Sequence, residues 1–433
     1  MKISLLTDLY EFTMAQIYVE EGMEEEAVFE FFVRPDNRRA YYVMAGTQEL
    51  LKMLREFRFE DEEIEYLERS GKFGQKFLDY LRDFRFSGDV WALREGEIFL
   101  GGEPVVSVRA PLPQAQLVET ILINTLQHPI LVATKAARCV SVAQGTTLVD
   151  FGLRRAQGKD AGIQAARSSY IAGFAGTSNV LAGKEYGIPV FGTMAHSFVM
   201  AHESEEEAFE RFMRRYPDNS ILLVDTYDTI EGTKKAIAVA KRLGIPLRGV
   251  RLDSGDIETL ATKVRQMLDS AGFGEALVLV SGGVDEFVIA DLLAKNVPID
   301  AWGVGTKLVV SEDMPSLDCA YKLVEYAGKP RFKKSRGKVT LPAQKQIKRV
   351  WDEQGLFKED LVEVMEAMSE GLLHKVMERG QIRYQESLDS IRQRAAKGLR
   401  QLPPAMLQLR PKTLYLPRLG PKLSALYRKL MTP

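Results

Sequence analysis

The sequence predicts an α/β protein in which a parallel β/α domain is combined with a second, mixed domain. The chain has 433 residues, which exceeds the usual size of one domain. From about residue 125 onward, short apolar runs alternate regularly with helical stretches, which is typical of a parallel β/α array. Hydrophobic residues make up 45% of the chain, enough for a large core. We therefore expect two domains.

The amino-terminal part predicts an α+β domain over residues 1–125. Here β-rich runs lie among helical segments, a mixture typical of an α+β unit. The expected strands are 27–33, 41–45, 89–93 and 105–108, and the expected helices are 47–57 and 62–82.

The middle of the chain, residues 126–312, predicts a β/α barrel, complete or incomplete, in preference to an open sheet. Its strands recur every 25 to 40 residues or so, a spacing that matches repeated β/α units. The expected strands are 147–151, 188–192, 221–225, 248–253, 277–280 and 300–304, with helices at 230–243, 255–271 and 284–295.

After residue 310 the alternation stops, and the chain is expected to return to the first domain over residues 313–390. Runs at 316–324 and 344–351 look like strands of another sheet, with a basic, hairpin-like stretch at 329–338 between them.

The carboxyl-terminal extension, residues 391–433, is basic. Residues 390–433 contain ten Arg or Lys and no acid, and five prolines between positions 403 and 421 exclude one long helix. Two interpretations stay open: an arm that contacts phosphate or a partner subunit, or a solvated surface extension that balances an acidic body.

Charge and cysteine content exclude several classes of function. Lys plus Arg is 58 and Asp plus Glu is 59, so nothing favours nucleic acid or an anionic membrane as the main partner. The amino terminus reaches Asp8 before any signal-like apolar run, and no later run approaches the roughly 20 apolar residues of a membrane span. Cys139 and Cys319 lack metal-type spacing with His. We expect a cytoplasmic protein with reduced thiols.

Chemically useful residues follow the predicted strands, where loops of a barrel converge. His196, one of four histidines, follows the apolar run 188–191, which reads as a buried strand. The other strand ends carry Arg154–Arg155, then 251–256, and the glycine-rich turns 281–285 and 303–307. Arginines suit phosphate or carboxylate oxygens, Asp pairs suit a ribose diol or Mg²⁺, and Gly-rich turns expose N–H groups to phosphate. Each loop alone has an ordinary structural explanation, as a tight turn or a helix cap. Together they predict an enzyme that handles a phosphorylated sugar.

Five motifs carry a resemblance to a known family. Segments 6–10, 151–155, 176–179, 192–197 and 251–256 occur in the order found in nicotinate phosphoribosyltransferases, and the resemblance extends over about residues 1–350. It implies a type II phosphoribosyltransferase: an irregular β/α barrel plus an α/β sandwich built from the N-terminal and C-terminal parts of the chain. The implied reaction converts nicotinate and phosphoribosyl diphosphate to nicotinate mononucleotide and pyrophosphate in NAD salvage. It is coupled to ATP hydrolysis through a phosphohistidine, which would be His196.

The resemblance also implies roles for single residues. His196, Arg251 and Asp253 would be catalytic, and Asp253, with Asp225 as a weaker candidate, would serve the ribose hydroxyls or Mg²⁺. Such proteins form homodimers in which the amino-terminal domain of one subunit covers the partner's barrel. The implied substrate-binding residues are Asp8, Tyr10, Arg34, Phe151, Arg154, Ser178, Ser197, Gly282, Gly283, Gly305 and Thr306.

Within that set the implied contacts differ. Phe151 and Tyr10 of the other subunit would stack on the two faces of the pyridine ring, and Arg34 would reach phosphate across the dimer. Arg154 and Arg251 would face carboxylate and phosphate oxygens. The four residues of the glycine-rich turns, Gly282, Gly283, Gly305 and Thr306, would hold the 5′-phosphate.

Other interpretations remain. A nicotinamide phosphoribosyltransferase shares most motifs, but in that branch an Asp stands where this chain has Ser178, whose hydroxyl can donate to a carboxylate. A quinolinate phosphoribosyltransferase resembles a shorter chain without the His196 motif. From another class, a non-catalytic barrel could bind a phosphosugar. Tyr10, for its part, could simply open an amphipathic helix.

Overall fold

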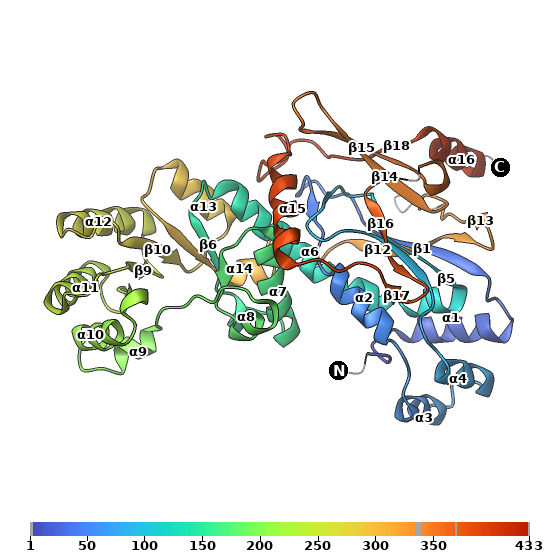
Figure 1. The fold of residues 1–433 in the computed structure, drawn as a ribbon, viewed down its shortest axis with the longest axis horizontal. Helices are drawn as coiled ribbons and strands as arrows, with labels where there is room; N and C mark the ends of the chain where they lie inside the picture. Colours follow the sequence, from blue (N-terminus) through green and yellow to red (C-terminus); the bar gives the residue numbers. More distant parts are fainter. Residues whose placement is uncertain (1–2, 335–339, 369, 432–433) are drawn as a thin grey trace. The chain divides into compact units, whose positions relative to one another are not determined.

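The computed structural model describes residues 3–334, 340–368 and 370–431 (Figure 1). The chain divides into two compact units. The first comprises residues 1–134 and 316–433, and the second comprises residues 135–315. The predicted class, a mixed α/β protein of two units with a parallel sheet in one of them, is confirmed.

A seven-stranded antiparallel sheet forms the centre of the first unit. Its order is β13-β12-β1-β5-β3-β16-β17, so three strands from the amino-terminal part lie in the centre and strands from the carboxyl-terminal part flank them on both sides. β1 pairs on one side with β12, through Phe29 and Leu323, and on the other with β5, through Phe29 and Val108. The strands are β1 (Glu26–Val33), β3 (Asp89–Leu93), β5 (Pro104–Pro111), β12 (Cys319–Tyr326), β13 (Lys329–Pro330), β16 (Leu373–Glu378) and β17 (Gln381–Ile382).

Helices and a short two-stranded sheet complete the amino-terminal part of this unit. The helix expected at 62–82 is two helices, because Gly71 adopts φ +65° and ends the first. The elements are α1 (Leu9–Glu20), β2 (Tyr42–Val43), α2 (Thr47–Glu56), α3 (Asp61–Arg69), α4 (Gln75–Arg82), β4 (Ile98–Phe99), α5 (Leu112–Leu117) and α6 (Glu119–Val142), which runs on into the second unit.

The carboxyl-terminal segment packs into the first unit. β14 (Lys345–Trp351), β15 (Phe357–Val364) and β18 (Arg418–Leu419) form a three-stranded sheet, accompanied by α15 (Leu388–Arg400), α16 (Pro421–Met431) and the 3₁₀ turn η3 (Met365–Ala367). Glu363 accepts hydrogen bonds from the N–H groups of Lys422 and Leu423 and so caps α16. Of the expected basic hairpin, residues 329–330 form β13, while residues 335–339 lie outside the described residues.

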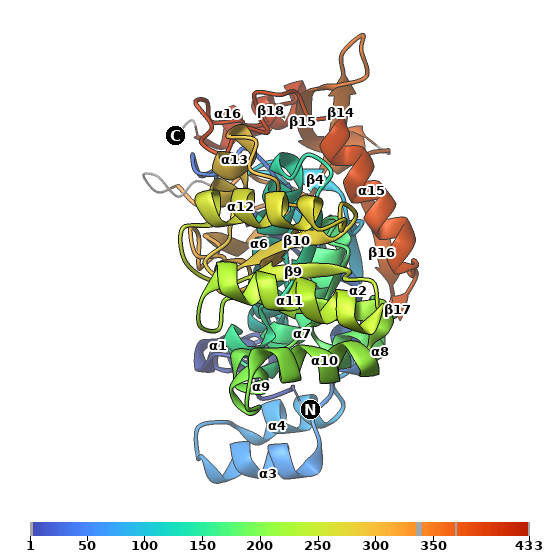
Figure 2. The same ribbon diagram turned by 90° about the vertical axis from the view of Figure 1, so that its left-hand side faces the viewer.

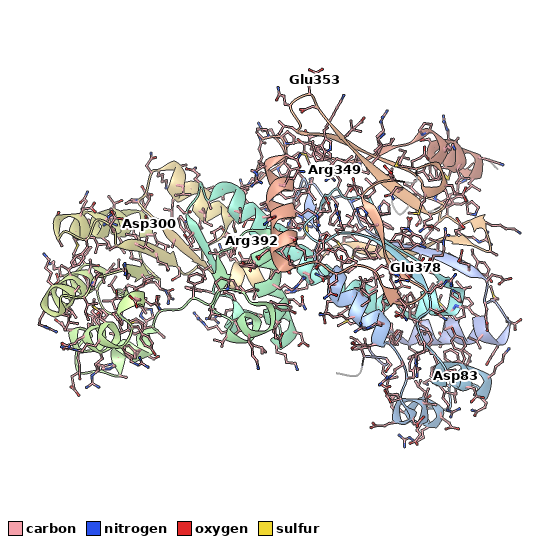
Figure 3. All side chains as sticks on the ribbon, in the orientation of Figure 1. Asp83, Asp300, Arg349, Glu353, Glu378 and Arg392 are labelled. Atoms are coloured by element: carbon pink, nitrogen blue, oxygen red, sulfur yellow. The ribbon has the colours of Figure 1, made fainter. Side chains whose placement is uncertain are left out.

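A buried charge cluster joins this small sheet to the β4–β5 connection. Arg349, labelled on β14 in Figure 3, forms an ion pair with Asp360 on β15 at 2.6 Å and donates to the carbonyl of Ile98. Glu103 is fully buried beside Asp360. Burial and the neighbouring Asp360 raise the pKa of Glu103 well above its ordinary value, so its carboxyl group keeps its proton.

The second unit contains a six-stranded parallel sheet in the order β7-β6-β11-β10-β9-β8. Figures 1 and 2 show helices α10, α11 and α12 along one face of β9 and β10. β11 is buried along its whole length, as expected for a strand of a covered parallel sheet. The strands are β6 (Thr147–Asp150), β7 (Gly176–Thr177), β8 (Ile221–Leu223), β9 (Gly249–Leu252), β10 (Leu277–Ser281) and β11 (Ala301–Val304).

The helices of the second unit connect these strands. They are α7 (Lys159–Ala172), α8 (Val180–Tyr186), α9 (His196–Met200), α10 (Glu205–Arg215), α11 (Thr229–Leu243), α12 (Ile257–Ser270), α13 (Glu286–Ala294) and α14 (Thr306–Val309), with 3₁₀ turns η1 (Leu153–Arg155) and η2 (Pro217–Asn219). None of the helices among the described residues is both long and apolar enough to cross a membrane.

The strand expected at 188–192 is wrong. This segment makes a single parallel bridge, between Thr177 and Val190, and Val190 and Phe191 are 48% and 42% exposed. Pro189 has no N–H group to donate to a ladder, which explains why pairing does not extend. His196 therefore opens helix α9 after an irregular loop and does not follow a buried strand.

Candidate active site

Arg251, Asp253 and Ser281 form a hydrogen-bonded triangle at the carboxyl ends of β9 and β10. Arg251 Nη2 lies 2.7 Å from Asp253 Oδ1, and Arg251 Nε donates to Ser281 Oγ at 2.8 Å. The Ser281 hydroxyl in turn donates to Asp253 Oδ1. Burial alone would raise the pKa of Asp253, but the hydrogen bonds from Ser281 and Arg251 hold that pKa below its ordinary value. Asp253 is therefore an ionised acceptor at neutral pH.

The Arg251 guanidinium also contacts two other loops. Its Nη1 donates to Thr193 Oγ1 at 3.3 Å and to the carbonyl oxygen of Met194 at 3.2 Å. Its Cζ lies 5.5 Å from the centroid of the Phe151 ring. One cation thus sits beside an aromatic wall and beside the loop that leads to His196, a combination that suits a planar anion.

His196 lies between two carboxylates. Its side chain is 40% exposed, and its Nε2 is 4.0 Å from Asp225 Oδ1 and 3.9 Å from Asp253 Oδ2. Its Nδ1 is 3.2 Å from the hydroxyl oxygen of Thr226. Residues 192–194, just before it, line a cavity of about 450 Å³ with aromatic walls. The imidazole is accessible and oriented by its neighbours, as a reacting group must be.

Asp225 has one carboxylate oxygen that no described group satisfies. Oδ2 accepts hydrogen bonds from the backbone N–H of Asp253 and from the Ser254 hydroxyl. Oδ1 is buried, has no hydrogen-bond partner among the described residues and points toward His196. An unpaired buried carboxylate oxygen is costly, so this position fits a cation or a protonated imidazole.

Two acidic side chains are therefore available to a magnesium ion. Among the described residues there is no group of three or more His, Cys, Asp or Glu side chains arranged as a metal cluster. Mg²⁺ commonly uses only one or two carboxylates together with substrate phosphates and water. Asp225 and Asp253 fit that pattern. The unpaired Oδ1 makes Asp225 a stronger candidate for a magnesium ligand than the sequence alone indicated.

The glycine-rich turn after β10 needs glycine for steric reasons. Gly282 adopts φ +80°, and a Cβ there would lie 2.0 Å from the carbonyl oxygen of Asp253. Gly283 adopts φ +67° with open space around it, so its backbone is accessible to a ligand. On the neighbouring strand, Gly305 and the exposed Thr306 follow β11. Because β10 and β11 are paired parallel strands, both turns end at the same edge of the sheet.

Phe151 and Ser178 are positioned by one buried acid, Asp150. Asp150 accepts hydrogen bonds from the Gly152 N–H and the Thr177 hydroxyl, and its carbonyl accepts from the Ser178 N–H at 2.8 Å. Burial raises the pKa of Asp150. Behind Phe151 lies Gly303, where a Cβ would come within 2.4 Å of the ring. The backbone next to Phe151 and the backbone of Ser178 are thus both held by hydrogen bonds to Asp150.

Arg154 and Ser197 are exposed. Arg154 lies in η1, immediately after the Phe151 loop, and Ser197 is the second residue of α9, next to His196. Arg154 thus follows β6, whereas Ser197 follows the irregular loop before α9, and both side chains are accessible to solvent.

Asp8, Tyr10 and Arg34 lie in the first unit. Asp8 precedes α1, and Tyr10, which is 44% exposed, lies in its opening turn. Burial and the nearby Glu119 raise the pKa of Tyr10, so it stays a neutral phenol. Arg34 forms an ion pair with Asp318 and lines a cavity of about 250 Å³. These three residues belong to a different unit from the rest of the candidate set.

Sequence reasoning missed several residues that hold this site together. Hydrogen bonds between loops join the candidate site residues or the segments that carry them to Ser281, Thr193, Thr226 and Asp150. The only sequence signal for Ser281 is its place directly before the Gly282–Gly283 turn, and Asp150 stands directly before the Phe151 motif.

Comparison with known proteins identifies similar sequences and structures. Residues 5–127 match the nicotinate phosphoribosyltransferase (NAPRTase) N-terminal domain, and residues 146–365 match the nicotinate phosphoribosyltransferase (NAPRTase) family. Nicotinate phosphoribosyltransferase pncB2 of Mycobacterium tuberculosis is 48% identical over 413 residues, covering 94% of this chain and 89% of that protein. The nicotinate phosphoribosyltransferase of Bacillus subtilis is 42% identical over 359 residues, covering 80% of this chain and 73% of that protein. A crystal structure of human nicotinic acid phosphoribosyltransferase has a TM-score of 0.85 and 29% identity, covering 98% of this chain and 99% of that one.

Proposed function

Because the chain belongs to the nicotinate phosphoribosyltransferase family, we propose that it transfers the phosphoribosyl group of phosphoribosyl diphosphate to nicotinate. The products are nicotinate mononucleotide and pyrophosphate, and the step serves NAD salvage in the cytoplasm. The observation that carries this proposal is the grouping of Phe151, Arg251 and Asp253 with two glycine-rich turns at one edge of a parallel sheet.

The residues divide the work of the transfer between them. Phe151 provides a flat apolar wall for the pyridine ring, which orients the ring nitrogen toward the sugar carbon. Arg251 and Arg154 attract the carboxylate and phosphate oxygens. The ring nitrogen of nicotinate is already a free nucleophile, so the transfer requires no base. As the bond to pyrophosphate breaks, positive charge develops on the sugar, and the carboxylate of Asp253 would stabilise that charge or hold the ribose hydroxyls.

Asp253 and Asp225 would hold Mg²⁺, which supplies positive charge to the pyrophosphate leaving group when it is bound. The unpaired Asp225 Oδ1 supports this assignment. The same oxygen lies close enough to His196 Nε2 to receive an ionic contact when the imidazole is protonated.

His196 is proposed as the phosphoryl acceptor that couples ATP hydrolysis to nucleotide formation. In this step a ring nitrogen forms a bond to the γ-phosphorus of ATP, and ADP leaves; water later cleaves the phosphohistidine to inorganic phosphate. The absence of any need for a base in the transfer leaves the imidazole available for this role. Its exposed side chain between Asp225 and Asp253 supports the assignment.

The proposed assembly is a homodimer with composite sites. Asp8, Tyr10 and Arg34 of one subunit would complete the site of the other, with Tyr10 stacking on the second face of the pyridine ring. Support comes from the apolar side chains exposed at the start of the chain, because Leu6, Leu9 and Tyr10 are 47%, 54% and 44% exposed. Large exposed apolar side chains grouped on one surface are typical of an interface.

A turnover assay with nicotinate and nicotinamide side by side tests the proposed reaction. We expect pyrophosphate release that requires nicotinate, and a kcat/KM for nicotinate far above that for nicotinamide, because donors placed for a carboxylate stay unpaired with an amide. Ser178→Asp should weaken the use of nicotinate, since it puts a negative charge near the substrate carboxylate. Comparable kcat/KM values would favour a nicotinamide phosphoribosyltransferase, and binding of phosphoribosyl diphosphate without turnover would favour a non-catalytic barrel.

A further inference from the structure

An ion pair links the two glycine-rich turns beyond the ends of their strands. Lys307 Nζ lies 2.9 Å from Asp285 Oδ2. Lys307 follows Gly305 and Thr306, and Asp285 follows Gly282 and Gly283. The Asp285 side chain is 8% exposed and that of Lys307 is 27% exposed, so the pair is largely removed from water.

Asp285 is rigidly held on its own side of this link. Its Oδ1 accepts hydrogen bonds from the N–H groups of Phe287 and Val288, at 3.1 and 2.9 Å, and so caps α13. The next residue, Glu286, is fully buried and forms ion pairs with Lys135 and Arg138, at 2.8 and 2.9 Å. Oδ1 of Asp285 therefore caps α13, and Oδ2 forms the ion pair with Lys307.

The strand ladder itself does not fix the turns. The last register pair between β10 and β11 is Ser281 with Gly303, and both turns lie beyond it. Gly282 and Gly283, which have left-handed backbone conformations, and Gly305 in the other turn have no side chains with which to anchor the two turns to each other. Two such turns must keep a constant separation if both are to donate to one phosphate.

We propose that Asp285 and Lys307 are positioning residues that hold the two glycine-rich turns at the spacing needed to bind a 5′-phosphate. This inference rests on the proposed function, because it assumes that the turns receive that phosphate. Lys307 acts through Asp285 and does not itself contact the ligand. The pair therefore governs affinity for phosphorylated ligands, and it has no part in binding the pyridine ring.

Two substitutions separate this role from a direct contact with phosphate. Asp285→Asn keeps the Oδ1 acceptor that caps α13 but removes the nearer of the two carboxylates beside Lys307, the other being Glu312 at 3.8 Å, and Lys307→Met removes the ammonium group. We expect each variant to weaken binding of nicotinate mononucleotide by about five- to tenfold, as for the loss of a coupled, largely buried pair. The double variant should be no weaker than either single variant, and Lys307→Arg should restore most of the affinity.

Isothermal titration with nicotinate mononucleotide, and separately with nicotinate, measures these effects in the full-length protein. The KM for phosphoribosyl diphosphate should rise while kcat stays within about twofold and nicotinate affinity stays unchanged. Lys295→Met is the matched control, because Lys295 lies at the opposite end of α13 from Asp285 and pairs with Glu258 and Asp291. It should leave nicotinate mononucleotide binding unchanged.

Three other outcomes would contradict the positioning role, any role in binding, or the proposed function itself. If Lys307→Met weakens binding while Asp285→Asn preserves or strengthens it, Lys307 contacts phosphate directly and the positioning role is wrong. If wild type binds nicotinate mononucleotide and both single variants bind it equally well, the pair has no role in binding. If wild type binds neither nicotinate mononucleotide nor phosphoribosyl diphosphate, the proposed function fails and this role fails with it. Amide hydrogen exchange without ligand gives an independent check, because Lys307→Met should accelerate exchange in both turns if the pair holds them.

Discussion

Replacing Gly303 by alanine should displace the aromatic wall of the site. A Cβ at this position would lie 2.4 Å from Phe151 Cδ2 and 2.7 Å from Cε2. Carbon atoms in contact prefer separations of about 3.5–4.0 Å, so the ring must move by at least about 1 Å. A displacement of that size at a substrate-positioning group can cost about 100-fold in rate. We therefore expect the kcat/KM for nicotinate to fall by roughly 10- to 100-fold in Gly303→Ala.

Steady-state kinetics with nicotinate as the varied substrate, together with a thermal melt, measure this effect. Gly274→Ala is the matched control, because a Cβ at Gly274 meets nothing within 4 Å. Affinity for phosphoribosyl diphosphate should change little in Gly303→Ala, since the glycine-rich turns remain intact. Wild-type kcat/KM in a folded Gly303→Ala protein would refute the assignment of Phe151 as the ring-stacking wall.

Three further predictions follow from other parts of the chain. His196→Ala should keep some ATP-independent transfer but lose stimulation by ATP, and γ-labelled ATP should leave an acid-labile label on wild type only; equal stimulation in both would make His196 structural. Glu103→Gln should remove a pH-dependent loss of stability. In wild type the pKa of Glu103 is raised in the folded state, so the free energy of unfolding falls relative to the variant as pH rises from about 4.3 toward that pKa, by up to about 1.4 kcal/mol per pH unit. If the stabilities of wild type and variant changed with pH in the same way, Glu103 would not have a raised pKa in the folded protein. Mixing inactive Tyr10→Ala with inactive Arg251→Ala should restore activity in heterodimers if the sites are composite, and no recovery in verified heterodimers would place both groups in one subunit.

The parallel strands were predictable because they are short, mostly apolar and largely buried. β6, β8, β9, β10 and β11 lie within one or two residues of the expected ranges. The return of the chain to its first unit was also predictable in outline, and β12 pairs directly with β1. The segment 188–192 has the same apolar composition as these strands, but Pro189 limits it to one bridge. Composition alone does not tell whether a neighbouring strand is available for pairing.

The candidate site could be predicted as a set of loops but not as a network. Arg251 and Asp253 are two residues apart in the sequence, so their contact is local. Ser281 is 30 residues from Arg251, and Thr193 is 58 residues from it, so nothing in a single sequence indicates these hydrogen bonds. The same holds for the unpaired Oδ1 of Asp225, whose importance depends on burial.

The hydrogen bonds of Arg251 determine what its binding of a substrate carboxylate would disturb. Of its five N–H groups, Nε donates one, Nη1 donates two and Nη2 donates one within the described residues, so a ligand oxygen that binds Nε or Nη1 must replace or share an existing acceptor. The contacts of Nε and Nη2 with Ser281 and Asp253 are 2.8 and 2.7 Å, and the latter is a charged pair. The contacts of Nη1 with Thr193 and Met194 are longer, 3.3 and 3.2 Å, and involve neutral acceptors, so they are the weaker ones. An anion that binds Nη1 therefore competes with the loop that ends at His196, so Arg251 physically connects the Phe151 ring with the loop that carries His196.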